Sequence, residues 1–120
     1  MTASEAFVKF VSKVLIPAKA KRFSALASTT KGQRSILDAL SHDLERAVRS
    51  NATKGRHYED LWTRPCFVFH CTLEFGIEIA SVRDAYERLA KDESWLILLQ
   101  DGSAGIHRPE GHWDNEMIIA

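Results

Sequence analysis

The apolar pattern of the chain changes from a helical to a strand-like period at residues 65–79, which read PCFVFHCTLEFGIEI. Apolar side chains fill the odd positions from 67 onward. The even positions carry polar side chains at His70, Thr72, Glu74 and Glu78. Strict alternation predicts a half-buried strand with the odd positions facing inward. The run is longer than a usual strand, so we predict a break or bulge at Gly76, with a hairpin turning at residues 72–73 as the alternative.

The residues before this stretch have the apolar period of α-helices. Apolar side chains recur at i, i+3, i+4 and i+7 over 3–15 and over 30–49, which predicts an amphipathic helix in each range. A proline at the start of 17–28 suits the first turn of a further helix, because its missing N–H would have no partner there. Thr30 and Gln33 have the spacing of a capping box and mark the start of the third helix.

The residues after this stretch return to helix and then to strands. Ser81 is expected to cap a helix that continues to about residue 90. The apolar run that begins at Trp95 predicts a central strand. Asp101-Gly102 is a favoured two-residue turn, so 95–100 and 103–108 are predicted to form a hairpin. Residues 113–119 offer a last strand.

These predictions together define the α+β fold class, because helices and strands are segregated along the chain. We expect one domain over 1–120, with a basic helical part at 1–49 and an acidic part at 65–120 that holds the sheet and one helix. The three N-terminal helices should pack on a mainly antiparallel sheet of three to five strands. The fourth helix should lie between strands, and 50–64 should be a connecting loop.

Composition excludes several classes of protein. The 120 residues are 45% hydrophobic and 27% charged, which is ordinary for a soluble globular domain and unlike a disordered chain. No apolar run reaches about 18 residues, so no membrane partner is expected. Lys9 and Lys13 interrupt the apolar N-terminal stretch, which argues against a signal peptide. The two cysteines, Cys66 and Cys71, are expected to be free buried thiols of a cytoplasmic protein.

The net charge of zero conceals a separation of charge along the chain. Residues 1–56 hold eleven Lys and Arg against four Asp and Glu, and residues 57–120 hold five against twelve. Such asymmetry points either to an electrostatic partner or to two halves that neutralise each other within the fold.

Catalytic and metal-binding patterns are weak in this sequence. Cys66 and His70 are about 13 Å apart along one strand face, too far for a nucleophile and its base. His107, His112 and Asp114 are ligand types for zinc around a predicted turn, but their spacing matches no metal signature and an ordinary polar loop is the simpler interpretation. We expect no cofactor. A small enzyme or metal protein using His70, His107 or His112 remains one hypothesis.

The leading hypothesis from the sequence is a non-enzymatic protein-interaction module, of which immunity or antitoxin-like inhibitors are one form. Its acidic C-terminal half would bind a basic protein partner, because charge complementarity speeds association and selects the partner. Trp113 would serve as an aromatic anchor. The expected contact residues are Glu74, Glu78, Asp101, Glu110, Trp113, Asp114 and Glu116.

The alternative hypothesis is a nucleic-acid-binding protein that uses the basic N-terminal helices. Stacking aromatics are missing from the predicted outer face, since Phe7, Phe10 and Phe23 fall on the inner one. The strand edge at 113–120 could also pair with a second copy to form a homodimer. The expected nucleic-acid contacts are Lys9, Lys13, Lys19, Lys21, Arg22, Lys31 and Arg34.

Overall fold

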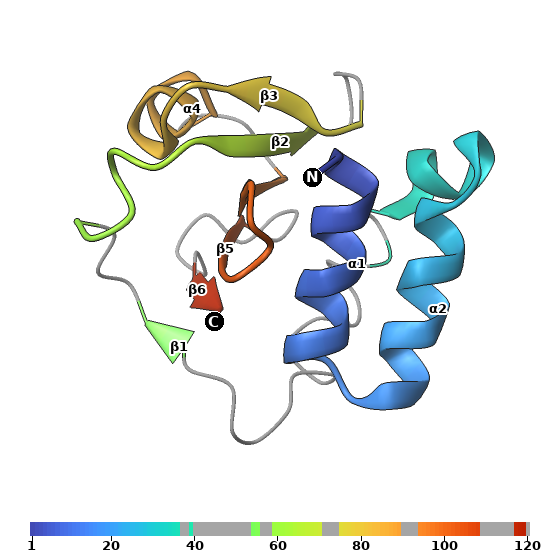
Figure 1. Ribbon diagram of the computed structural model, residues 1–120. Coiled ribbons are helices and arrows are strands. Elements are labelled where there is room, and N and C mark those ends of the chain that lie inside the picture. The colour runs from blue at the N-terminus through green and yellow to red at the C-terminus, as the bar shows by residue number, and fades with distance from the viewer. Residues whose placement is uncertain are drawn as a thin grey trace.

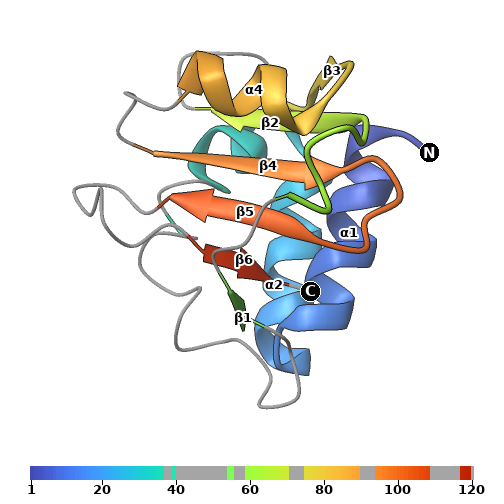
Figure 2. The same ribbon diagram turned by 90° about the vertical axis from the view of Figure 1, so that its left-hand side faces the viewer.

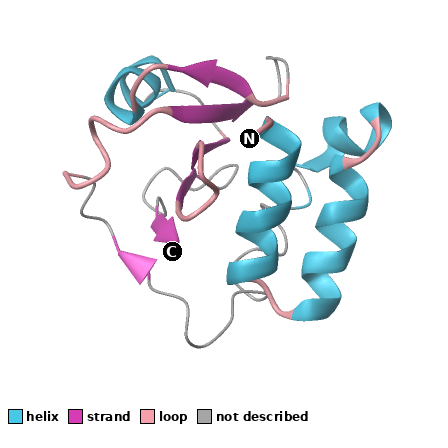
Figure 3. Cartoon of the chain, in the orientation of Figure 1, coloured by secondary structure: helices cyan, strands magenta, loops and turns pink. Residues whose placement is uncertain are grey.

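The protein is an α+β domain in which N-terminal helices pack on an antiparallel sheet (Figure 1). A computed structural model describes residues 1–36, 39, 54–55, 59–70, 75–89, 94–108 and 117–119. Helices precede the sheet in the chain, and one further helix, α4 (Val82–Leu89), lies between strands (Figure 3). The predicted fold class is therefore confirmed.

The two first helices begin and end where local chemistry dictates. In α1 (Ala3–Val14), Thr2 and Glu5 form a capping box: the Thr2 N–H donates to the Glu5 carboxylate at 3.1 Å, and the Glu5 N–H donates to Thr2 Oγ1 at 3.2 Å. Leu15 and Ile16 are extended and separate α1 from α2 (Pro17–Ala27). The proline stands at the first position of α2, as predicted.

The third N-terminal helix is described over residues 30–36. Its cap differs from the predicted pair of Thr30 and Gln33. Thr29 Oγ1 accepts from the Gly32 N–H at 2.9 Å, one residue earlier than expected. The Gln33 side chain instead donates to the Ala27 carbonyl at 2.8 Å, because α2 ends close by and leaves that carbonyl without a helical partner. The rest of the predicted 30–49 helix falls outside the described residues, apart from the helical residue 39.

In the described part of the chain, six strands form one sheet with the order β1-β6-β5-β4-β2-β3, and every neighbouring pair is antiparallel (Figure 2). This is one strand more than expected, because the predicted loop at 50–64 contributes a two-residue strand. The strands are β1 (Lys54–Gly55), β2 (Cys66–His70), β3 (Ile77–Ile79), β4 (Trp95–Leu99), β5 (Gly105–Arg108) and β6 (Met117–Ile119).

The long alternating stretch forms two antiparallel strands, β2 and β3, and the register of Val68 opposite Ile77 is centred between positions 72 and 73. The alternative hairpin is therefore confirmed over a single strand interrupted at Gly76, which precedes β3 with a positive φ of 72°. The predicted half-burial was wrong for β2. Its odd residues Phe67 and Phe69 pack under the N-terminal helices, whereas its even residues Cys66 and Val68 pack under α4. Both faces of β2 are buried because a helix layer covers each side of the sheet at this strand.

The core has two parts, one on each side of the sheet. On the inner side, Phe7, Phe10 and Phe23 of the helices pack against Leu96 and Leu98 of β4. On the outer side, α4 packs against the alternate residues of the same strands. Figure 2 shows α1 and α2 behind the sheet and α4 at its β2–β3 end.

Two predictions about strand connections also need correction. Strands β4 and β5 do form the predicted hairpin, with Leu98 opposite Gly105, but the connection spans 100–104 and is longer than a two-residue turn. Strand β6 is not a free edge: β1 pairs with it at Ile118 and Ile119. The homodimer contact predicted through that edge is therefore blocked at these two residues.

Candidate functional site

Cationic side chains gather on the N-terminal helices, which cover one face of the sheet. Within residues 1–36 the only carboxylate is Glu5. Lys19 is half-buried, and the other Lys and Arg side chains of this region are exposed. We call this set the cationic layer: Lys9, Lys13, Lys19, Lys21, Arg22, Lys31 and Arg34.

The apolar faces of the N-terminal helices pack against the sheet, so the cationic side chains lie on the opposite, outer faces. Phe7, Phe10 and Val14 are fully buried, so the intervening lysines of α1 must face solvent or the neighbouring loop. Lys13 Nζ donates to the Ser103 carbonyl at 3.2 Å. The contact orients α1 against the loop between β4 and β5.

Gly102 allows that loop to approach α1 closely. Its φ is +74°, and a Cβ at this position would lie 2.8 Å from the Ala6 carbonyl oxygen and 3.1 Å from Lys9 Cβ. Any larger residue would push the loop away from the helix. The sequence marked Gly102 as a turn residue but gave no sign of this contact with a helix.

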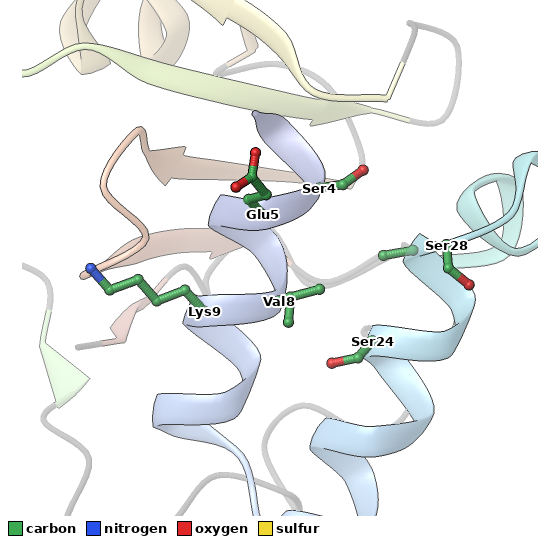
Figure 4. Close-up of a pocket in the computed structure, with 7 residues that line it drawn as sticks. Ser4, Glu5, Val8, Lys9, Ser24 and Ser28 are labelled. Atoms are coloured by element: carbon green, nitrogen blue, oxygen red, sulfur yellow. The ribbon is translucent and has the colours of Figure 1, made fainter. Parts of the chain in front are cut away.

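An apolar groove runs between the outer surfaces of α1 and α2 (Figure 4). It has a volume of about 390 Å³ and lies at the end where α1 begins and α2 ends. Its lining residues are Ser4, Glu5, Val8, Lys9, Ser24, Ala27 and Ser28. Sequence reasoning missed the groove, because α2 has weak amphipathic character and its outward serines and alanines are not distinctive.

The predicted acidic contact surface is only partly described. Glu74, Glu110, Trp113, Asp114 and Glu116 lie outside the described residues.

Glu78 and Asp101, the two described members of that surface, are both exposed and lie at the same end of the sheet. Glu78 accepts from Gln100 Nε2 at 3.0 Å, and Asp101 is the next residue along.

Asp101 is held in a network of its own. Its carboxylate accepts from Ser103 Oγ at 2.6 Å and from the Ser103 N–H at 2.9 Å, and it forms an ion pair with Arg64. These partners lower the pKa of Asp101, with the Ser103 hydroxyl the largest cause. A carboxylate engaged in this way orders the β4–β5 loop and is less available to an external cation.

The histidines do not form a metal centre in the described part of the chain. His107 lies in β5, within the predicted strand 103–108, and is only 1% exposed, whereas the sequence suggested a polar loop for the set of His107, His112 and Asp114. Burial lowers its pKa to about 4, and its Nε2 atom has no hydrogen-bond partner among the described residues. His70 is the last residue of β2 and is partly exposed. His112 and Asp114 lie outside the described residues. Among the described residues, no three His, Cys, Asp or Glu side chains gather as metal ligands.

Cys66 is a buried free thiol at the start of β2. Burial, aided by the negative charge of Asp84, raises its pKa to about 12. A thiol in this state is almost wholly protonated near neutral pH and is a poor nucleophile.

A row of aromatic side chains ends in a buried arginine on the α4 side of the sheet. The ring centroids of Trp62 and Tyr86 are 5.3 Å apart, and those of Tyr86 and Trp95 are 5.7 Å apart, both edge to face. Arg108 lies over the Trp95 ring. Trp62 packs against this part of the core. The burial of Arg108 was not foreseen, because charged residues at strand ends are usually solvated.

Comparison with protein-family models, with curated proteins and with solved structures finds no match to this chain. None of the helices in the described residues has the length and apolar character needed to cross a membrane. Functional inference therefore rests on the surface chemistry of the domain.

Proposed function

We propose that this protein is a binding module that recognises an anionic macromolecule through its cationic layer. One observation carries the proposal: seven Lys and Arg side chains and a single carboxylate lie in residues 1–36, and the three helices that carry them cover the same face of the sheet. Charges of one sign on one face produce a field that attracts a polyanion over about a Debye length, ~8 Å in physiological salt.

Some of these cations stand where they weaken the helices that carry them. Lys9 and Lys13 are like charges at i, i+4, which costs roughly 0.2–0.5 kcal/mol of helix stability. Lys31 lies in the first turn of its helix, where the helix dipole disfavours a positive charge. Binding of an anion would offset both costs.

Nucleic acid is one class of anionic partner that this layer could bind. The aromatic side chains Phe7, Phe10 and Phe23 are fully buried and offer no stacking surface. Contacts would therefore be to phosphates, with little sequence selectivity and a steep dependence on salt.

The test is fluorescence anisotropy of labelled DNA duplex, single-stranded RNA and polyglutamate titrated with the protein at rising salt. We expect binding to at least one probe and an affinity that falls with salt. Lys21→Glu with Arg34→Glu should weaken binding by about tenfold or more, because each reversal changes the local charge by two units. Arg83→Glu with Arg88→Glu, an equal charge reversal on α4, is the matched control and should have a smaller effect. Failure of all three probes to bind would overturn the proposal.

A second candidate is the protein-interaction module that binds a basic partner through its acidic face, as immunity and antitoxin-like proteins do. Exposure of the Glu78 carboxylate on β3 supports it, whereas Asp101 is engaged by Arg64 and Ser103. The test is to capture partner proteins with the parent protein and with the Glu78→Lys variant, each at low and at high salt. A salt-sensitive basic partner that the variant no longer binds is the expected result, and equal capture by variant and parent would contradict it.

We propose the cytoplasm as the site of action. The described cysteine, Cys66, is a free thiol, and unpaired buried thiols are typical of reducing compartments.

A further inference from the structure

The groove between α1 and α2, called the trough below, presents apolar surface to solvent. Val8 is 37% exposed and points across the groove toward α2, from which Ser24 points back (Figure 4). Val8 and Ser24, which point toward each other, are both short, so the helices leave a trough of about 390 Å³ between them.

Two of the polar groups around this trough take part in hydrogen bonds within their own helical segments. The Glu5 carboxylate accepts from the Thr2 N–H as part of the α1 cap. Ser28 Oγ donates to the Ala25 carbonyl of its own helix at 2.7 Å. The Ser28 hydroxyl proton is thereby used within α2, whereas the exposed Glu5 carboxylate keeps its negative charge at the α1 end of the trough.

Positive charge flanks the trough on both helices. Lys9 lies on the α1 rim with its ammonium group directed away from α2 (Figure 4). On α2, Lys21 is one helical turn before Ser24 and shares its side of the helix. An occupant that complements this site has apolar side chains in its centre and carboxylates at its margins.

These features favour a polypeptide over a nucleic acid. A base needs an aromatic or guanidinium plane for stacking, and the lining of the trough has neither. An amphipathic helix instead places apolar side chains at i, i+3, i+4 and i+7 along a groove of this kind.

We infer that the trough binds an acidic amphipathic helix of a protein partner. Its apolar stripe lies between Val8 and Ser24, and its carboxylates face Lys9 and Lys21. The inference rests on the proposed function, because it names the class of anionic macromolecule that the cationic layer receives.

The experiment uses the full chain and two synthetic labelled peptides of equal composition. One carries leucines at i, i+3, i+4 and i+7 among glutamates, and the other has the same residues scrambled. Two matched pairs of variants place an identical negative charge inside or outside the trough: Ser24→Glu against Ala25→Glu on α2, and Val8→Glu against Ser12→Glu on α1. Ala25 and Ser12 are exposed and do not line the trough. Circular dichroism checks that each variant is folded, and the α1 pair decides the matter if Ser24→Glu does not fold.

We expect the amphipathic peptide to bind more tightly than its scrambled form. Ser24→Glu and Val8→Glu should each weaken that binding by about tenfold or more, since a central buried anchor dominates such contacts. Ala25→Glu and Ser12→Glu should weaken it by a smaller factor, of purely electrostatic origin.

Other outcomes separate this inference from the proposed function. Equal losses within each matched pair, or equal binding of both peptides, would overturn the trough as the site while leaving anion binding by the cationic layer in place. Tighter binding of DNA or RNA than of the amphipathic peptide would also overturn the inference and would assign a nucleic acid as partner. Absence of binding to every anionic probe would overturn both.

Discussion

The guanidinium carbon of Arg108 lies 5.1 Å from the centroid of the Trp95 ring, and the two residues face each other across β4 and β5. Arg108 is only 5% exposed and Trp95 is fully buried. A desolvated guanidinium over an indole is a cation–π contact of the stronger kind. This pair joins the outer core to the central strands of the sheet.

A double-mutant cycle should measure the strength of this pair. Trp95→Leu and Arg108→Met are each expected to destabilise the fold, and their coupling energy should be about 1–2 kcal/mol in favour of the native pair. Urea unfolding followed by circular dichroism gives the free energies. Additive losses would contradict a direct interaction between the two side chains.

Stability should depend on pH through His107. Its pKa is lowered from 6.5 to about 4 in the folded protein, so the unfolded chain binds more protons between these values. The free energy of unfolding should therefore fall as the pH is lowered from 6.5 to about 4, by an amount on the order of 3 kcal/mol, and level off below. Urea titrations at a series of pH values measure this slope.

His107→Leu provides the control for that slope. The leucine removes the buried ring nitrogen and cannot titrate, so the variant should lose the His107 share of the pH dependence between pH 4 and 6.5. Identical slopes in the variant and the parent would show that His107 is not responsible.

The Cys66 thiol should be unreactive in the folded protein. In a Cys71→Ser background, modification by a thiol reagent near pH 8 should be slow, because a pKa of about 12 leaves little thiolate and the side chain is buried. Addition of denaturant should make the reaction fast. Rapid modification without denaturant would contradict the burial of Cys66.

Gly102→Ala should destabilise the protein by about 1–3 kcal/mol, because Gly102 has a positive φ and faces the Ala6 carbonyl. Thermal unfolding measures the loss. The same substitution in a Lys9→Ala background should be nearly as harmful, since Lys9→Ala removes a flexible side chain but neither the backbone contact nor the φ requirement. Full rescue by Lys9→Ala would assign the cost to the lysine alone.

Local periodicity predicted most of the elements correctly. The spacing of Phe7, Phe10 and Val14 identified the buried face of α1. The alternation identified the strand residues of β2 and β3, which pair as the hairpin given as the alternative to a break at Gly76. The predictions that failed concern the burial of side chains, which depends on the elements that pack against them. Cys66 and Val68 are buried because α4 covers them, and the burial of His107 within its predicted strand was likewise not foreseen.

The candidate site also has a part that can be listed from the sequence and a part that only helix packing creates. The members of the cationic layer could be listed from the sequence, because charge is a property of composition, and their role as contact residues stays a prediction. The groove was not predicted, because it exists only between two helices whose separation depends on their short side chains. The acidic surface remains a prediction for the residues outside the described part of the chain.

The amino-acid sequence by itself determined the types and order of the elements other than the short strand β1, and the separation of charge, since these follow from apolar periods of two or of three to four residues and from counting. Only the tertiary structure decided which helix covers which face of the sheet, the pairing of Arg108 with Trp95 and the trough between α1 and α2. Burial and distance between remote segments depend on how the whole chain packs, and no short stretch of sequence contains that information.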